Sequence, residues 1–230
     1  MSTPLIIGTG IKKSFGTGDL ITHVLLGIDI TIMEGEFVAI MGKSGAGKST
    51  LMYQLSVLDE PTSGTITVAG VETTTLSEKE QTQFRLNTLG YVFQDYALVP
   101  DLSAEENVLL PLMMRGLRMN DARAIARQAI DSVGLAGKYE NLPSELSGGE
   151  QQRIAIARAV AGKPRILFAD EPTANLDSVS SEQIIALLTS LNQEQGQTIV
   201  MVTHEREYAQ TADRIIYMED GQIIKQTAPT

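Results

Sequence analysis

The chain has 230 residues, a formal net charge of −10 and no cysteine. Nucleic-acid binding requires basic surface, so the acidic balance argues against DNA or RNA as the main partner, and also against direct adsorption to anionic lipid. Without cysteine, disulfides and cysteine-ligated metal sites are impossible, which fits a reducing cytosolic compartment.

The apolar segments are too short to cross a membrane. The longest run, residues 108–114, is interrupted by Pro111, whereas a transmembrane helix needs about 20 apolar residues. The N-terminal segment has no basic residues before its short apolar run, so we expect no signal peptide there. Any role at a membrane is therefore expected to depend on a partner chain.

The predicted strands are of two kinds. Some show partial alternation of apolar and polar residues with glycine turns, which favours an antiparallel β layer near the N-terminus. Others are short and continuously apolar, which is typical of parallel strands buried on both faces. In chain order the predicted strands cover residues 5–11, 24–32, 37–41, 64–71, 166–169, 198–202, 215–218 and 223–224, of which the last two form a hairpin.

Helices are predicted between these strands. Three of them begin with a serine that is followed three residues later by a glutamate, the capping-box pattern: Ser77/Glu80, Ser103/Glu106 and Ser147/Glu150. The third helix is expected to run to Ala161, where Gly162 ends it and Pro164 prevents its continuation. A further helix is expected over residues 180–193, closed by Gly196.

Strands that alternate with helices predict an α/β fold with a mainly parallel sheet. The polar and mostly helical residues 76–163 are expected to form an inserted α-helical subdomain. Residues 1–75 and 164–230 then form the α/β catalytic lobe, and residues 1–230 make up a single domain.

Residues 42–49, GKSGAGKS, match the P-loop pattern G-x-x-x-x-G-K-[ST] between a predicted strand and a predicted helix. Glycines let backbone N–H groups converge on phosphate oxygens, and the helix adds its positive N-terminal end. We expect Lys48 to meet the β- and γ-phosphates and Ser49 to bind Mg²⁺. The candidate phosphate-binding residues are Gly42, Lys43, Ser44, Gly45, Ala46, Gly47, Lys48, Ser49 and Thr50. Kinases, GTPases and motor ATPases share this loop, but the N-K-x-D motif of GTPases is absent.

Two carboxylates follow the apolar run 166–169. At the end of a strand beside a P-loop, Asp170 is predicted to hold the Mg²⁺ shell, and Glu171 to orient and deprotonate the attacking water. His204, which follows the run 198–202, is predicted to contact the γ-phosphate and that water. The alternatives are a surface turn with two solvated acids and a hydrogen-bonded surface histidine.

The segment LSGGEQ, residues 146–151, has a second glycine-rich helix start. A capping box explains Ser147 and Glu150, but not Gly148 and Gly149, which cost conformational entropy and bring no packing of their own. A second anion-binding helix N-terminus would explain them. These four residues are therefore predicted to contact nucleotide phosphate.

With this segment, LSGGEQQR, nearly the whole chain resembles the ATP-binding subunits of ABC transporters. Gln94 in YVFQD is similar to the family's Q-loop glutamine, which contacts Mg²⁺ or water, and Asp177 in DEPTANLDS to its D-loop acid. His204 is similar to the switch histidine. Phe15 in KKSFG matches the aromatic that stacks on adenine, although packing into the β layer is an alternative. Lys43 stands where many relatives have proline.

The resemblance implies the ABC ATPase fold with a P-loop NTPase core, the cofactors ATP and Mg²⁺, and a head-to-tail dimer. In that dimer residues 147–149 of one copy cap the nucleotide on Lys48 of the other. The segments KSFGTGD and LDEPTSG are similar to those of macrolide-exporter and lipoprotein-releasing ATPases. This finer resemblance implies a cytoplasmic subunit on the inner face of the membrane that powers a separate permease.

Two hypotheses about what the ATPase does for its membrane partner stay open. The ATPase can drive export or lipoprotein-directed work, or it can regulate a membrane complex without moving cargo. A soluble ABC ATPase of DNA repair or translation is disfavoured by the single cassette and the acidic charge. Residues 96–114, with Leu98, Val99 and Leu102, are expected either to receive a permease helix or to pack within the helical subdomain.

Overall fold

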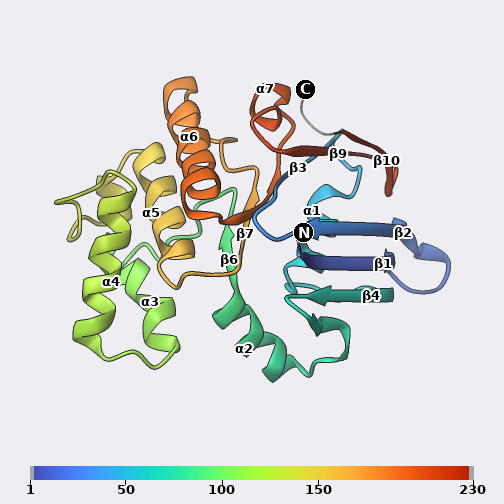
Figure 1. Ribbon diagram of the computed structural model, residues 1–230, viewed down its shortest axis with the longest axis horizontal. Helices are drawn as coiled ribbons and strands as arrows, with labels where there is room; N and C mark the ends of the chain where they lie inside the picture. The colour runs from blue at the N-terminus through green and yellow to red at the C-terminus, as the bar shows by residue number, and fades with distance from the viewer. Residues whose placement is uncertain (1–2, 228–230) are drawn as a thin grey trace.

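The helices and strands form two sheets with a helical group beside them (Figure 1). They belong to a computed structural model that describes residues 3–227. The strands are β1 (Pro4–Phe15), β2 (Thr22–Met33), β3 (Phe37–Gly42), β4 (Ser63–Val68), β5 (Val71–Glu72), β6 (Leu89–Val92), β7 (Ile166–Asp170), β8 (Thr198–Val202), β9 (Arg214–Glu219) and β10 (Gln222–Thr227). The α-helices are α1 (Lys48–Leu55), α2 (Glu78–Thr88), α3 (Ala104–Met114), α4 (Met119–Ser132), α5 (Gly148–Val160), α6 (Ser178–Gln195) and α7 (Arg206–Ala209), and short 3-10 turns cover Gly18–Leu20, Thr73–Thr75 and Pro143–Glu145. Within residues 3–227 no helix is both long and apolar enough to cross a membrane.

The larger sheet has the strand order β10-β9-β3-β8-β7-β6. Every neighbouring pair from β9 to β6 is parallel, and only β10 runs antiparallel, paired with β9. Along β3, Phe37 and Ala39 belong to the core shared with α3–α6, whereas Val38 and Ile40 belong to the core shared with α1 and the smaller sheet. Because successive side chains point to opposite faces and both faces are covered, the strand is apolar throughout.

The smaller sheet has the order β2-β1-β4-β5 and is antiparallel. This confirms the predicted N-terminal β layer. Helix α1 adds Leu51, Met52 and Leu55 to the core beneath that layer, and all three are fully buried. Burial of each such side chain stabilises the fold by about 1.5–3 kcal/mol, which fixes the direction of the helix that leaves the P-loop.

Two details differ from the sequence-based expectations. Residues 89–92, placed in the expected helical subdomain, form strand β6 at the edge of the larger sheet and pair with β7. Gly162 follows α5 as expected but has no positive φ; Lys163 takes the left-handed conformation instead. Gly162 instead leaves room for the guanidinium of Arg115, which would lie 2.4 Å from a Cβ at this position and would have to move aside.

The three predicted capping boxes are all present, at the starts of α2, α3 and α5. Helix α6 is capped by Asp177 and closed by Gly196, which adopts a left-handed conformation. These motifs were predictable because each depends on residues that are neighbours in the sequence.

An ion-pair cluster joins the helices of the helical subdomain. Glu105, at the start of α3, accepts hydrogen bonds from Arg123 at 2.6 Å and from Arg127, both on α4. The backbone N–H of Glu105 also donates to the carbonyl of Tyr139 at 2.9 Å. Since Tyr139 belongs to the segment between α4 and α5, the cluster holds the chain that leads into the LSGGEQ segment.

Candidate nucleotide-binding site

The P-loop connects the end of β3 to the start of α1. Gly45 and Gly47 have φ angles of 82° and 92°, which residues with a Cβ rarely adopt. A Cβ at Gly42 would lie 2.3 Å from the carbonyl oxygen of Met218, so this position is closed to larger residues for steric reasons. The loop therefore needs its glycines both for its curvature and for its approach to β9.

Lys48 begins α1 and turns back across the loop. Its ammonium donates to the carbonyl of Lys43 at 3.1 Å, and only 7% of the residue is exposed. The carbonyl of Lys43 also accepts the N–H of Ala46 at 3.1 Å. A buried cation at the N-terminal end of a helix, beside a curled backbone, is a site for phosphate oxygens.

A pocket of about 570 Å³ opens over this loop. It brings together residues that the sequence analysis selected from three separate segments, and it adds Val24 of β2, which was not expected. Its lining consists of Val24, Ser44, Gly45, Gly47, Lys48, Ser49, Thr50, Glu171 and His204. Gln94, Asp177, Phe15 and the LSGGEQ segment do not line it.

Asp170 is the last residue of β7 and lies behind the P-loop serine. The hydroxyl of Ser49 donates to its Oδ1 at 3.1 Å, and the hydroxyl of Tyr91 lies 3.5 Å from its Oδ2. Burial raises the pKa of the Asp170 carboxyl; the Ser49 hydrogen bond opposes this, and the charge of Glu171 adds to it. Tyr91, on β6, was missed because only the pairing of β6 with β7 brings it close.

Glu171 and His204 face each other at the mouth of the pocket. Nδ1 of His204 lies 3.2 Å from Oε2 of Glu171, and the histidine side chain is more exposed than the glutamate. Glu171 has a φ of 44°, and its N–H donates to the carbonyl of Val202 at 3.0 Å. The left-handed backbone costs roughly 1–3 kcal/mol, and the bond to β8 holds the backbone from which the carboxylate projects.

The side chain of Gln94 is exposed, but the backbone around it is firmly held. The amide of Asn175 donates to the carbonyl of Gln94 at 3.2 Å and to Asp95 at 3.1 Å. Arg158 donates to the carbonyls of Tyr96 and Ala97, which both have positive φ. Sequence reasoning missed both supporting residues; the only signal was that Asn175 lies inside the segment DEPTANLDS.

The LSGGEQ segment starts α5 with the predicted capping box. The N–H of Glu150 donates to Oγ of Ser147 at 3.3 Å, and the carboxylate of Glu150 accepts the N–H of Ser147 at 2.9 Å. The hydrogen bond from the Ser147 backbone lowers the pKa of the Glu150 carboxyl, and the bond and charge of Lys138 lower it further. Burial acts in the opposite direction but does not outweigh them.

The glycines of this segment have packing roles, contrary to expectation. A Cβ at Gly148 would lie 2.9 Å from the hydroxyl of Tyr96, and one at Gly149 would lie 2.8 Å from Oγ of Ser180. The sequence predicts anion binding for both glycines, because nothing in the local sequence indicates these neighbours. Close packing within the chain therefore favours glycine at both positions, in addition to any role in anion binding.

Asp177 and Phe15 lie at the ends of their elements. Asp177 accepts the N–H of Ser180 at 2.8 Å as the cap of α6, and hydrogen bonds from Ser180 lower its pKa. Phe15 ends β1 with 47% of the residue exposed and belongs to neither core cluster. One side of its ring faces the ammonium of Lys13, 5.0 Å from the ring centroid.

Fold and site together define a P-loop nucleotide-binding cassette. A family model described as ABC transporter matches residues 25–174, and the chain belongs to this family. Relatives include the macrolide export ATP-binding/permease protein MacB of Rhodopirellula baltica, 45% identical, and the lipoprotein-releasing system ATP-binding protein LolD of Shewanella frigidimarina, 41% identical. Each match covers 96% of this chain, together with 33% of MacB and 93% of LolD. The chain thus spans about a third of the MacB relatives that it matches.

The same fold occurs in the solved dimeric structure of MJ0796, described as a bacterial ABC transporter cassette. The TM-score is 0.91 at 40% identity, and the match covers 98% of this chain and 99% of that one. A second dimeric structure of MJ0796 is described as a post-hydrolysis state bound to ADP and phosphate, at 39% identity and the same TM-score. The likeness confirms the ABC ATPase fold predicted from the sequence.

Proposed function

We propose that this chain binds ATP in the pocket over the P-loop and hydrolyses it to ADP and phosphate. The observation that carries the proposal is the convergence of Lys48, Ser49, Glu171 and His204 on one pocket, with Asp170 bonded behind Ser49. Residues 42–50 hold the triphosphate, through backbone N–H groups and the ammonium of Lys48. Phe15, exposed at the end of β1, stacks on the adenine ring.

The residues beside the P-loop fit Mg²⁺. The hydroxyl of Ser49 and the carboxylate of Asp170 are hard oxygen ligands 3.1 Å apart, and Gln94 would add an amide oxygen. Within residues 3–227 there is no group of three or more Asp, Glu, His or Cys side chains that could hold a metal ion. Mg²⁺ is normally bound by one or two side chains together with phosphates and water, so this sparse set suits it. When bound, it would neutralise charge on the β- and γ-phosphates.

Glu171 acts as the general base in the proposed reaction. Its fixed backbone directs the carboxylate into the pocket, where it orients the attacking water and accepts its proton. His204, 3.2 Å from Glu171, contacts the same water and the γ-phosphate. Positioning by a general base typically accelerates such a step by about 10²- to 10⁴-fold.

Two copies of the chain complete the site in the proposed working state. Ser147, Gly148, Gly149 and Glu150 start a helix but do not line the pocket of their own chain, so they are available to cap nucleotide on a second copy. Asp177 lies close to this segment, because it caps α6 through Ser180, whose Oγ would be 2.8 Å from a Cβ at Gly149. The dimeric structures of MJ0796 support this arrangement.

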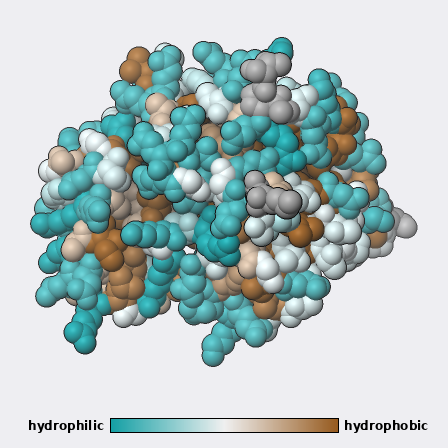
Figure 2. Space-filling model, in the orientation of Figure 1, coloured by the Kyte–Doolittle hydropathy of each residue, from teal (hydrophilic) through white to brown (hydrophobic). Residues whose placement is uncertain are grey.

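A membrane permease is the proposed partner, and the cytoplasmic face of the membrane the proposed location. Large apolar side chains on α3 are exposed, namely Leu110, Met113 and Met114, and Figure 2 shows apolar surface where Figure 1 places α3. Leu98 instead packs against the core, although Val99 is exposed. An exposed apolar patch of this kind favours a protein partner, so α3 is the part of residues 96–114 that we assign to docking.

The substitution Glu171→Gln tests the proposal. It keeps the side chain's size but removes the base, so we expect ATP hydrolysis to fall at least about 100-fold while ATP binding persists. With ATP and Mg²⁺ the variant should elute from a sizing column as a dimer, because the ATP that holds the two copies together is not hydrolysed. Glu207→Gln, an exposed acid on α7, is the matched control. A Glu171→Gln variant that hydrolyses ATP normally, or stays monomeric with ATP bound, would contradict the proposal.

A further inference from the structure

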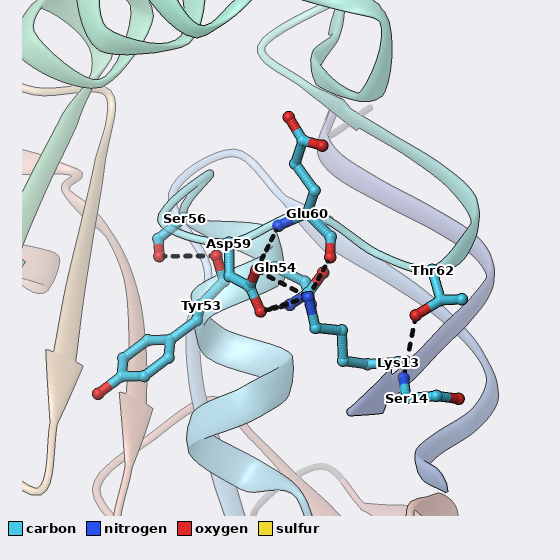
Figure 3. A network of polar contacts seen from close by, with 8 residues as sticks. All are labelled: Lys13, Ser14, Tyr53, Gln54, Ser56, Asp59, Glu60 and Thr62. Atoms are coloured by element: carbon cyan, nitrogen blue, oxygen red, sulfur yellow. Dashed lines mark hydrogen bonds and ion pairs between the residues drawn. The ribbon is translucent and has the colours of Figure 1, made fainter. Parts of the chain in front are cut away.

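Two segments that lie outside the lining of the phosphate pocket are bonded to each other. They are KKSFG, which ends β1, and LDEPTSG, which connects α1 to β4. The ammonium of Lys13 lies 2.7 Å from each oxygen of the Asp59 carboxylate and donates to the carbonyl of Glu60 at 2.6 Å. Figure 3 shows this ammonium between the two residues, beside the end of α1. We refer to Lys13, Asp59, Glu60 and Thr62 as the clasp.

Backbone contacts reinforce the clasp. The N–H of Ser14 donates to Oγ1 of Thr62 at 3.0 Å, and the N–H of Thr62 donates to the carbonyl of Lys12 at 2.8 Å. Residues 12–14 of β1 are therefore fixed to the connecting segment on both sides of Lys13. Phe15 is the next residue, so the clasp sets the direction in which the strand presents its ring.

The clasp is also fixed to the helix that carries the P-loop lysine. Gln54, in the last turn of α1, is 1% exposed and donates from its amide to Asp59 at 2.9 Å. The N–H of Glu60 donates to the same carboxylate at 2.9 Å. Burial opposes ionisation of Asp59, but the bonds from Lys13, Glu60 and Gln54 outweigh it and lower the pKa of this carboxyl. Asp59 is thus a charged junction between α1 and β1.

Lys13 also covers Phe15 directly. Its ammonium lies 5.0 Å from the ring centroid, within the range of a cation–π contact, and its side chain is only 12% exposed. A cation on one face of the ring draws π density away from the opposite face, which favours stacking of an electron-rich base there. The ring is also restrained before a ligand arrives, which lowers the entropy lost on binding.

We propose that Lys13 and Asp59 are positioning residues for the nucleobase, holding Phe15 in the orientation that stacks on adenine. The proposal rests on the proposed function, since it assumes that ATP binds over the P-loop with its base at Phe15. It assigns a role to the LDEPTSG segment, which has no contact with the phosphate pocket. The clasp should therefore affect the base-dependent part of the affinity and not the phosphate-dependent part.

The test compares ATP with inorganic tripolyphosphate, which has the phosphates but no base, by calorimetric titration of the full chain. Lys13→Met keeps the aliphatic stem and removes the cation; we expect it to weaken ATP about two- to fivefold, the scale of one cation–π contact, and to leave tripolyphosphate unchanged. Phe15→Ala should show the same selectivity with a loss of about fivefold or more. Asp59→Asn should resemble Lys13→Met, and the double variant should lose no more than either single one.

Two control variants keep the outcomes distinct. Lys12→Met removes the neighbouring exposed cation and should change neither affinity, and Lys13→Arg should retain most of the ATP affinity. If Lys13→Met weakens both ligands equally, or neither, the positioning role is refuted. If the unaltered chain binds tripolyphosphate but Phe15→Ala leaves ATP affinity intact, the base does not lie on Phe15 and the inference fails while phosphate binding stands. If the unaltered chain binds neither ligand, the proposed function itself is wrong.

Discussion

The ion-pair cluster around Glu105 leads to a prediction in which one substitution has opposite effects in two backgrounds. The Glu105 side chain is 4% exposed, whereas its partners Arg123 and Arg127 are 50% and 45% exposed. Loss of the acid leaves two arginines that can turn to solvent. Loss of both arginines leaves a buried carboxylate without a countercharge, which is far less favourable.

The expected magnitudes follow from this asymmetry. Glu105→Met should lower the free energy of unfolding by about 1–2 kcal/mol, because hydrogen bonds to charged groups are replaced by apolar packing. Arg123→Ala with Arg127→Ala should lower it by about 3–5 kcal/mol, the scale for a broken buried pair. Added to that double variant, Glu105→Met should restore about 2 kcal/mol or more by removing the stranded charge.

Urea unfolding at neutral pH, without nucleotide, measures these differences. For a chain of this size about 1 kcal/mol corresponds to roughly 2–4 °C in Tm, so thermal unfolding gives an independent check. If Glu105→Met is destabilising by the same amount in both backgrounds, the carboxylate does not depend on the two arginines. The assignment of this cluster as the support for the segment before α5 would then be wrong.

Two further predictions concern single positions. Gly149→Ala places a methyl group against Ser180, which costs about 1–3 kcal/mol, while the helix preference of alanine returns at most about 1 kcal/mol. Tm without nucleotide should therefore fall, and Ser180→Gly should rescue it; an unchanged Tm with loss of the ATP-induced dimer would mean that the glycine serves a partner copy instead. The lowered pKa of Asp59 means that its ionised form stabilises the folded state fully above its ordinary pKa, and this contribution is lost as the pH falls through the lowered value. Asp59→Asn should thus flatten the loss of stability below about pH 4 in acid-unfolding curves, and a curve parallel to that of the unaltered chain would refute this.

The sequence by itself determined the features that depend on neighbouring residues. The P-loop, the three capping boxes and the continuously apolar strands were all predictable, because glycine spacing, serine–glutamate pairs and burial on both faces each leave a local pattern. The selection of Glu171 and His204 followed from their position after two such strands, and the pairing of β7 with β8 brings those strand ends together. Strand β6 was missed because four residues at a sheet edge carry too little pattern.

Only the tertiary structure decided which distant residues support the site. Tyr91 reaches Asp170, Asn175 and Arg158 hold the backbone near Gln94, and Lys13 meets Asp59, which lies 46 positions away along the chain. Such contacts leave no periodic signal, because each needs two elements to be packed before either side chain has a partner. Gly148 and Gly149 illustrate the same limit, since only folding brings the side chains of Tyr96 and Ser180 to where a Cβ at these positions would lie. Local chemistry thus specified the phosphate site, whereas packing specified what orients it.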